Sequence, residues 1–263
     1  MPSSDDAVLT RREGAVGVMT FNRADELNTL NLPMMRAMAS ALDRLEADPA
    51  VRVIVFTGAD ERAFIAGGDI SDLVSRTPST WYGEFGPMVH GLFRRVETCD
   101  KPTIAAVNGW ALGGGMEFVL CTDLRYMAAE ARIGVPEIRL GLFPGGGGSQ
   151  RLMRQIPLCQ AKRLIFTGDH LTAAQALDLG LMNEMLPRAE LMARVMSEAT
   201  RMAAMSANTL KVLKHAMLHG AEMPLDAALA YERAQLAVVL DHPDAQEGCQ
   251  AFLDKRKPRF AGT

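Results

Sequence analysis

Several features that would assign this chain to a specialised class of protein are missing from its sequence. No apolar stretch approaches the roughly 20 residues that a helix needs to span a bilayer, so we expect no membrane-spanning segment. The first 22 residues carry two early aspartates and no continuous apolar core, unlike a secretory signal or a transit peptide. Cysteine is scarce and forms no CxxC pair, which predicts reduced, mostly buried thiols and a cytoplasmic location. The cysteines are Cys99, Cys121, Cys159 and Cys249.

A strong charge of either sign is also missing. The net charge is −3 at pH 7 and the pI is near 6.0, so the charge balance predicts no attraction to nucleic acid or to an anionic membrane. The sequence contains no GxGxxG or Walker-type phosphate loop, no HExxH and no GxSxG nucleophile motif. Because the histidines form no recognisable ligand pattern, no metal site is expected.

The residues that are present predict an ordinary globular chain with an α/β body. With 263 residues, 48% of them hydrophobic, the chain can form one large domain or one main domain with an appendage. Runs of apolar and β-branched residues predict buried strands at 15–22, 51–58 and 101–109, and helical spacing predicts helices at 34–49 and 78–99. The order strand, helix, strand is typical of parallel pairing.

Beyond residue 112 the predicted elements change in character. Residues 112–123 predict a helix, and short strands are expected around 124–129 and 131–135. From Gly147 onward the sequence predicts only helices, separated by Gly, Pro or capping residues, at 149–157, 158–168, 172–180, 188–203, 206–219, 224–240 and 243–256. We therefore expect an all-helical C-terminal region after the α/β body.

Glu117 stands inside the apolar run MEFVL, directly after the three glycines 113–115. A buried carboxylate is costly unless it is paired or neutralised, so Glu117 is either an ion-paired core residue, a solvent-facing helix residue, or a catalytic acid or base. The glycines fall at a strand-to-helix turn, where amide groups without helical partners can stabilise an anion or a polarised carbonyl. Tight helix–strand packing is the structural alternative for these glycines.

Two further segments combine glycines with carboxylates. The segment AFIAGGDISDL (63–73) leaves a strand and enters a helix, with Asp69 as the expected cap. In GVPEIRLGLFPGGGGSQRL (134–152), Glu137 follows a proline and four consecutive glycines precede a helix. Taken alone, Glu137 fits a solvated loop residue. Taken with Glu117, beside donors aimed at a carbonyl, it suits addition or removal of water.

Together these three segments resemble the enoyl-CoA hydratase/isomerase (crotonase) family. AFIAGGDISDL is similar to the family segment AFxAGxD, and GVPEIRLGLFPGGGGSQRL is similar to PExxxGxxPGxGGxQRL. Between them, AAVNGWALGGGMEFVLCTDLR (105–125) is similar to xVxGxAxGGGxELxxxCDxR. The resemblance extends over nearly the whole chain, from FNRADELNTLN (21–31) to FLDKRKPRF (252–260).

The resemblance implies an α/β chain of crotonase (ClpP-like) fold. Residues 1–195 would form a spiral core of repeated ββα units that holds the acyl-CoA site, and residues 196–263 a helical C-terminal trimerisation region. Homotrimers, or hexamers made of two trimers, are then expected. The partner would be an acyl-CoA thioester that serves as the substrate, with no cofactor and no metal.

The same resemblance implies a role for individual residues. The backbone amides of Gly68 and Gly114 would hold the thioester oxygen, Glu117 would activate water for attack at C3, and Glu137 would supply the proton at C2 of a trans-2-enoyl-CoA. This is reversible syn hydration to a 3-hydroxyacyl-CoA. Residues implied to contact the CoA or acyl part are Leu27, Ala66, Gly67, Gly68, Asp69, Ile70, Trp110 and Gly114, with Phe252 and Lys255 near the nucleotide of a neighbouring subunit.

Two other functions remain open at this point. A Δ3,Δ2-enoyl-CoA isomerase would use one glutamate to move a proton between C2 and C4. A family member that binds RNA does so through a lysine-rich helix, whereas 34–49 holds two arginines and three acids, so RNA binding is not expected. Large side chains after the first CoA loop are expected near the acyl group, namely Trp81, Tyr82, Phe85 and Met88. The pathway stays open between fatty-acid, amino-acid and aromatic-acid catabolism.

Overall fold

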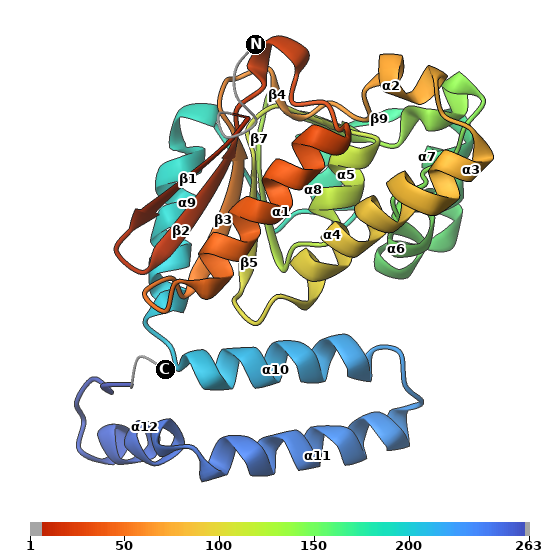
Figure 1. Cartoon of the computed structure of the whole chain (residues 1–263). Helices are drawn as coiled ribbons and strands as arrows, with labels where there is room; N and C mark the ends of the chain where they lie inside the picture. The colour runs from red at the N-terminus through yellow and green to blue at the C-terminus, as the bar shows by residue number, and fades with distance from the viewer. Residues whose placement is uncertain (1–6, 261–263) are drawn as a thin grey trace.

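The computed structural model describes residues 7–260, and within this range two sheets form the α/β body (Figure 1). The larger sheet has the strand order β1 (Val8–Glu13), β2 (Val16–Phe21), β3 (Val53–Gly58), β5 (Thr103–Val107), β7 (Leu124–Ala128) and β10 (Glu184–Leu186). Only β1 runs antiparallel to its neighbour. The central strands β3 and β5 are almost wholly buried apolar runs without alternation, because helices cover a parallel sheet on both faces.

The smaller sheet carries the loops that matter for function. Its order is β4 (Ala63–Ile65), β6 (Trp110–Leu112), β8 (Arg132–Gly134) and β9 (His170–Thr172), with only the β8–β9 pair antiparallel. Because β4, β6 and β8 are parallel neighbours, the chain leaves all three at the same edge of the sheet. The segments that follow them hold Gly68, Gly114 and Glu137, which brings these residues to one place.

Helices pack around the two sheets. Those of the body are α1 (Leu32–Ala47), α2 (Ile70–Val74), α3 (Pro78–Thr80), α4 (Gly86–Thr98), α5 (Gly114–Val119), α6 (Gly148–Gln155), α7 (Leu158–Thr167), α8 (Ala173–Asp178) and α9 (Arg188–Ala203). Among the described residues the body also contains the 3-10 turns η2 (Ala24–Glu26) and η4 (Pro136–Leu140) and the π-helical turn η3 (Trp81–Phe85). Helix α1 starts where the Asn31 side chain accepts from the Met34 amide, and it ends before Pro49.

The short helix α5 lies at the centre of the body. At Gly115 a Cβ atom would lie 1.9 Å from the Ile65 carbonyl oxygen, so only glycine lets α5 approach β4 this closely. Phe118 is 1% exposed and meets Phe21, Phe56 and Phe93 edge-on at centroid distances of 5.5, 5.0 and 5.6 Å. This packing fixes the helix on which Glu117 precedes Phe118.

Three C-terminal helices lie together along one side of the body (Figure 1): α10 (Ala207–Gly220), α11 (Leu225–Asp241) and α12 (Pro243–Leu253). Polar contacts join α10 to the body, where the Lys214 ammonium donates to Asp123 at 2.7 Å and Lys211 pairs with Asp100 at 2.6 Å. No residue of α10 or α11 is buried. This chain alone therefore leaves the apolar side chains of the two helices partly or fully exposed.

The structure confirms the main predicted elements and corrects several others. Strands 15–22, 51–58 and 101–109 correspond to β2, β3 and β5. The region after Gly147 is not all-helical, because β9 and β10 each add three residues to a sheet edge, too few to show a period of two. Two of the four thiols, those of Cys159 and Cys249, are exposed rather than buried.

Two predicted spans are divided differently in the structure. The segment 78–99 consists of α3, η3 and α4, since Gly86 and Pro87 follow the π turn. The expected boundary between residues 195 and 196 falls inside α9, which packs on the larger sheet with its residues Leu191, Val195 and Ala199 buried. The helical region therefore begins at the turn 204–206. Among residues 7–260, no helix combines the length and the apolar character needed to cross a membrane.

Replacing Phe118 by alanine tests the central packing. We expect the free energy of unfolding to fall by about 3–5 kcal/mol, because the change leaves a cavity between the rings of Phe21, Phe56 and Phe93. The exposed Phe166 on α7, 69% accessible, provides a matched control whose change to alanine should cost less than about 1 kcal/mol. Urea unfolding at one fixed protein concentration measures both, and equal losses would contradict this description of the core.

Candidate active site

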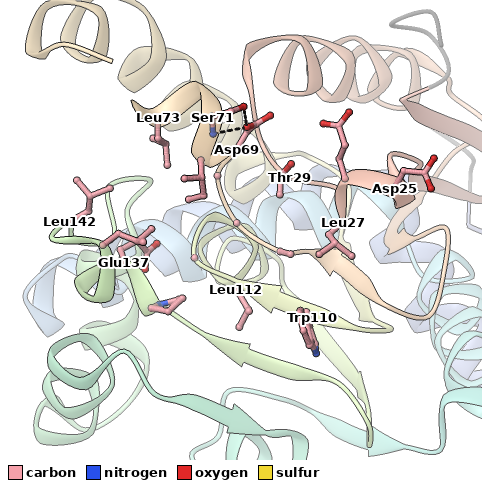
Figure 2. Close-up of a pocket in the computed structure, with 18 residues that line it drawn as sticks. Asp25, Leu27, Thr29, Asp69, Ser71, Leu73, Trp110, Leu112, Glu137 and Leu142 are labelled. Carbon is pink, nitrogen blue, oxygen red and sulfur yellow. Dashed lines mark hydrogen bonds between the residues drawn. The ribbon is translucent and has the colours of Figure 1, made fainter. Parts of the chain in front are cut away.

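Four residues from three chain segments line one cavity of about 600 Å³: Gly68, Gly114 and Glu117 of α5, and Glu137. A second cavity, of about 530 Å³, opens beside it and shares Gly68 and Glu137 with the first. Figure 2 shows this second cavity, with Leu27 and Trp110 at one end and Glu137 and Leu142 at the other. We call the first the reaction cavity and the second the groove.

The Gly68 amide is held in place by the segment around Leu27. The Ala66 amide donates to the Leu27 carbonyl at 3.0 Å and the Leu30 amide donates to the Gly67 carbonyl at 2.8 Å. Gly67 has φ +118°, a conformation that favours glycine. Just beyond, the Asp69 carboxylate accepts from the Ser71 amide at 3.1 Å and caps α2, as the sequence predicts. These bonds define the position of the loop on both sides of Gly68.

Gly114, at the start of α5, lines the same cavity. As the first helical residue, Gly114 has no partner for its N–H within the helix. Across the part of the chain that the structure describes, no hydrogen bond runs from the Gly68 or Gly114 amide to a protein acceptor. A Cβ atom on Gly113 would lie 3.6 Å from the Gly67 Cα atom, so the two loops touch. Two free amides at one cavity suit a carbonyl oxygen that gains negative charge.

Glu117 is a buried carboxylate, 3% exposed. Its Oε1 atom accepts from the Gly146 amide at 2.8 Å and from the Gly148 amide at 2.7 Å. A Cβ atom on Gly146 would lie 2.7 Å from Glu117 Oε2, so the turn packs directly against the carboxylate. Burial raises the pKa of Glu117, while the two amides and the positive charge of Arg151 oppose that rise.

Glu137 follows Pro136 in η4 and lines the reaction cavity together with Glu117. Burial, followed by the negative charge of Glu117, raises the pKa of Glu137 to about 7. Its Oε2 atom is buried and has no hydrogen-bond partner among the described residues. Two carboxyl groups coupled in this way can share a single proton near neutral pH, and this arrangement suits acid–base chemistry.

The structure gathers most of the residues that the sequence predicts at this site. The groove is lined by Leu27, Ala66, Gly67, Gly68, Asp69, Ile70 and Trp110. Phe252, at the end of α12, and Lys255, just beyond it, line neither cavity of this chain. Trp81 and Phe85 line the reaction cavity, with ring centroids 5.3 Å apart. Tyr82 is 86% exposed and Met88 is not part of the lining.

Sequence reasoning missed what binds the Glu117 carboxylate. It predicts either a flexible or a tightly packed turn at the four glycines 145–148, and the structure shows that two of their amides are the donors. It also gave no role to Arg151, whose guanidinium donates to the Gly146 carbonyl. Within residues 7–260, no cluster of three or more His, Cys, Asp or Glu side chains could hold a metal ion.

Two mostly parallel sheets whose loops bring two glycines with free amides and two glutamates to one cavity are typical of a protein of the crotonase class. Residues 11–263 match the enoyl-CoA hydratase/isomerase family, and the chain belongs to that family. This confirms the family and the fold that the sequence predicts.

Named relatives cover nearly the full length of the chain. The short-chain-enoyl-CoA hydratase of Clostridium acetobutylicum is 38% identical over 95% of both chains. The crotonyl-CoA hydratase of Syntrophomonas wolfei is 35% identical over 96% of this chain and 97% of the relative. A crystal structure of an enoyl-CoA hydratase from Bacillus anthracis superposes with a TM-score of 0.93 at 31% identity, over 98% of this chain and 100% of that one.

The raised pKa of Glu137 predicts that this site weakens the fold at alkaline pH. A carboxyl group whose pKa is higher in the folded than in the unfolded state loses its stabilising effect as the pH rises through the folded value, here about 7. Glu137→Gln should therefore be more stable than the natural protein at pH 8, by up to about 3 kcal/mol. Most of this gain should disappear at pH 5.

Urea unfolding at both pH values measures the effect. Glu130→Gln, which removes an exposed carboxylate outside both cavities, serves as the control and should show no such difference. If Glu137→Gln were no more stable than the natural protein at pH 8, Glu137 would not have the raised pKa that its burial beside Glu117 implies.

Proposed function

We propose that this protein is an enoyl-CoA hydratase, which adds water reversibly to a trans-2-enoyl-CoA and gives a 3-hydroxyacyl-CoA. The proposal rests on one observation: Glu117, Glu137 and the amides of Gly68 and Gly114 meet at a single cavity. The names of the Clostridium and Syntrophomonas relatives, hydratases of short-chain enoyl-CoA and of crotonyl-CoA, support the same substrate class.

In the proposed reaction, Glu117 takes a proton from water while the water oxygen forms a bond to C3. The π electrons of the C2–C3 double bond move toward the thioester oxygen, where the amides of Gly68 and Gly114 stabilise the negative charge. Removing one such donor typically costs about 3–4 kcal/mol. The enolate then takes the proton of Glu137 at C2, and proton exchange with solvent returns both carboxyl groups to their starting state. Both additions occur from the side of the glutamates, which makes them syn.

The surroundings of the two carboxyl groups support this division of roles. Burial raises the pKa of Glu117, and the two backbone N–H bonds that its carboxylate accepts oppose this rise and favour the ionised form that a base needs. Glu137 has a pKa of about 7 and keeps its proton at slightly acid to neutral pH, as an acid must. A Δ3,Δ2-isomerase needs only one of them. The presence of both therefore favours hydration, and these steps require no metal or redox cofactor.

We propose that the groove holds the pantetheine part of CoA and that a second subunit holds its phosphates. Carboxylates of Asp25, Glu26 and Asp69 line the groove, and no lysine or arginine is among its described lining residues. The basic segment 254–260 lies beyond α12, below the body and away from β4 in Figure 1. We therefore propose that Lys255 contacts the phosphates of a CoA bound to a neighbouring copy.

The uncovered helices support a homotrimer, or a hexamer made of two trimers. Several large apolar side chains of α10–α12 have more than half of their surface accessible. They are Met217, Leu225, Leu229, Leu236, Val238, Leu240, Phe252 and Leu253. A surface of this kind on a single chain is typical of an association interface. We also place the protein in the cytoplasm, because its four thiols are all free.

Hydration of crotonyl-CoA, followed as the loss of the conjugated enoyl-thioester absorbance, tests the activity. We expect turnover by the natural protein and a decrease in kcat of at least about 100-fold in Glu117→Gln and in Glu137→Gln. Glu130→Gln should keep full activity. Turnover that survives both substitutions in the site would contradict the mechanism, and conversion of a 3-enoyl thioester without hydration would identify an isomerase.

Changing Lys255 to alanine tests the contribution of a neighbouring subunit. We expect KM for crotonyl-CoA to rise about fivefold, which corresponds to the loss of one charge contact, with kcat unchanged. A crotonyl-pantetheine thioester, which lacks the nucleotide, should show no change. Light scattering should give a mass of three or six chains for both proteins.

The exposed Lys162 of α7 provides the control, since its change to alanine removes the same charge from another part of the surface. An equal rise in KM for Lys162→Ala, or a monomeric mass with full activity, would contradict the assignment of Lys255 to a neighbour's site.

A further inference from the structure

The turn that binds Glu117 is itself bound from behind by Arg151. The Nη1 atom of Arg151 donates to the Gly146 carbonyl at 3.2 Å. Gly146 thus accepts from Arg151 through its carbonyl and donates to Glu117 through its amide. A single residue therefore links the guanidinium to the carboxylate, and a shift of Arg151 must change the direction of the amides that hold Glu117.

Arg151 has little freedom to shift. Its Nε and Nη2 atoms donate to the two oxygens of Glu97 on α4, both at 3.1 Å. The side chains of Arg151 and Glu97 are only 16% and 17% exposed, and a two-point contact between a guanidinium and a carboxylate fixes orientation as well as distance. Nε and Nη2 of Arg151 thus donate to Glu97, while Nη1 donates to the Gly146 carbonyl in the turn.

The backbone of the turn is fitted to the guanidinium. A Cβ atom on Gly147 would lie 2.1 Å from Arg151 Nη1, and Gly147 has φ +107°. A residue with a side chain could not keep both this conformation and the contact with Arg151. At the neighbouring positions Gly146 and Gly148, a Cβ atom would lie within 3 Å of the Glu117 side chain, so a larger residue would clash with it. The turn is therefore enclosed between Arg151 on one side and Glu117 on the other.

Within the proposed hydratase function, we infer that Arg151 is a positioning residue for Glu117, which aims the Gly146 and Gly148 amides and places a positive charge behind the ionised carboxylate. Arg151 lines neither cavity, so it acts through the turn and does not touch the substrate. Glu97 in turn fixes Arg151. A purely structural ion pair between α4 and α6 would support folding but would not change the protonation of Glu117.

The charge of Arg151 gives this role a measurable signature. Burial raises the pKa of Glu117, and the positive charge of Arg151 is one of the effects that oppose the rise. Removing this charge should therefore raise the pH at which Glu117 becomes ionised. Since the base must be ionised to activate water, the acidic limb of the pH profile of kcat/KM should move to higher pH.

Three variants separate positioning from folding, with crotonyl-CoA as the substrate. In Arg151→Met we expect kcat to fall about 10- to 100-fold, as for a small misplacement of a catalytic group, while KM stays within about twofold. The acidic limb should move to higher pH, because the lost positive charge favoured the ionised form of Glu117. Arg151→Lys keeps the charge but not the two-point contact, so it should restore the limb and recover only part of kcat.

Arg94→Met is the matched control. Arg94 donates to the same Glu97 at 2.8 Å, but its side chain is 51% exposed and makes no contact with the turn. Its kcat and its pH profile should equal those of the natural protein. The inference is overturned if folded Arg151→Met keeps the natural kcat and acidic limb, or if Arg94→Met shows the same changes.

A second readout does not depend on turnover. Unfolding free energies are measured against pH for the natural protein and for Arg151→Met, each with and without the Glu117→Gln change. The difference that Glu117→Gln makes in each background reports the titration of Glu117. This titration should lie at higher pH in the Arg151→Met background than in the natural background. Unchanged titration would contradict the inference even if crotonyl-CoA were not the substrate, whereas a shifted titration without hydration would reject only the proposed function.

Discussion

The burial of the Glu117 carboxylate against the glycine turn 145–148 is the constraint on which the rest of the site depends. A carboxylate that is 3% exposed can stay ionised only if nearby donors replace the water it has lost. The turn 145–148 supplies two amides to this carboxylate. Side chains at 146 and 148 would clash with Glu117, and one at 147 would clash with Arg151, so these three positions require glycine. In the segment PGGGG, the backbone amides of Gly146 and Gly148 therefore replace the water that the Glu117 carboxylate has lost.

Helix α5 supplies two of the reacting groups at once. Its first residue, Gly114, offers a free amide, and one turn later Glu117 offers a carboxylate. Both face the reaction cavity, so the distance between oxyanion donor and base is fixed by helix geometry. The other half of the site, Gly68 and Glu137, comes from loops at the same sheet edge, and β4, β6 and β8 hold these loops in register. Short strands and a short helix thus place a rigid site at the meeting point of three chain segments.

Much of this arrangement could be predicted from the sequence, and the reasons for the gaps are physical. The β-branched runs of β2, β3 and β5 predict strands because burial on both faces leaves a continuous apolar pattern. Strands of three residues, such as β9 and β10, carry no period and exist only through pairing with a distant partner. The pair Glu117 and Glu137 could be proposed from motif order. The bonds from Gly146 and Gly148 to Glu117, and from Arg151 to Glu97, join residues 29 to 54 positions apart, a closeness that only the folded chain creates.

Isotope incorporation during turnover tests the central claim most directly, because it reports which bonds form at the paired carboxylates. Crotonyl-CoA is converted in water enriched in oxygen-18 and, separately, in deuterium oxide, and the products are analysed by mass spectrometry and NMR. The account predicts one oxygen-18 at C3 and one deuterium at C2, both added to the same face. Deuterium at C4 without oxygen-18, or addition to opposite faces, would contradict an active site in which Glu117 and Glu137 act from one side on an enoyl thioester held by Gly68 and Gly114.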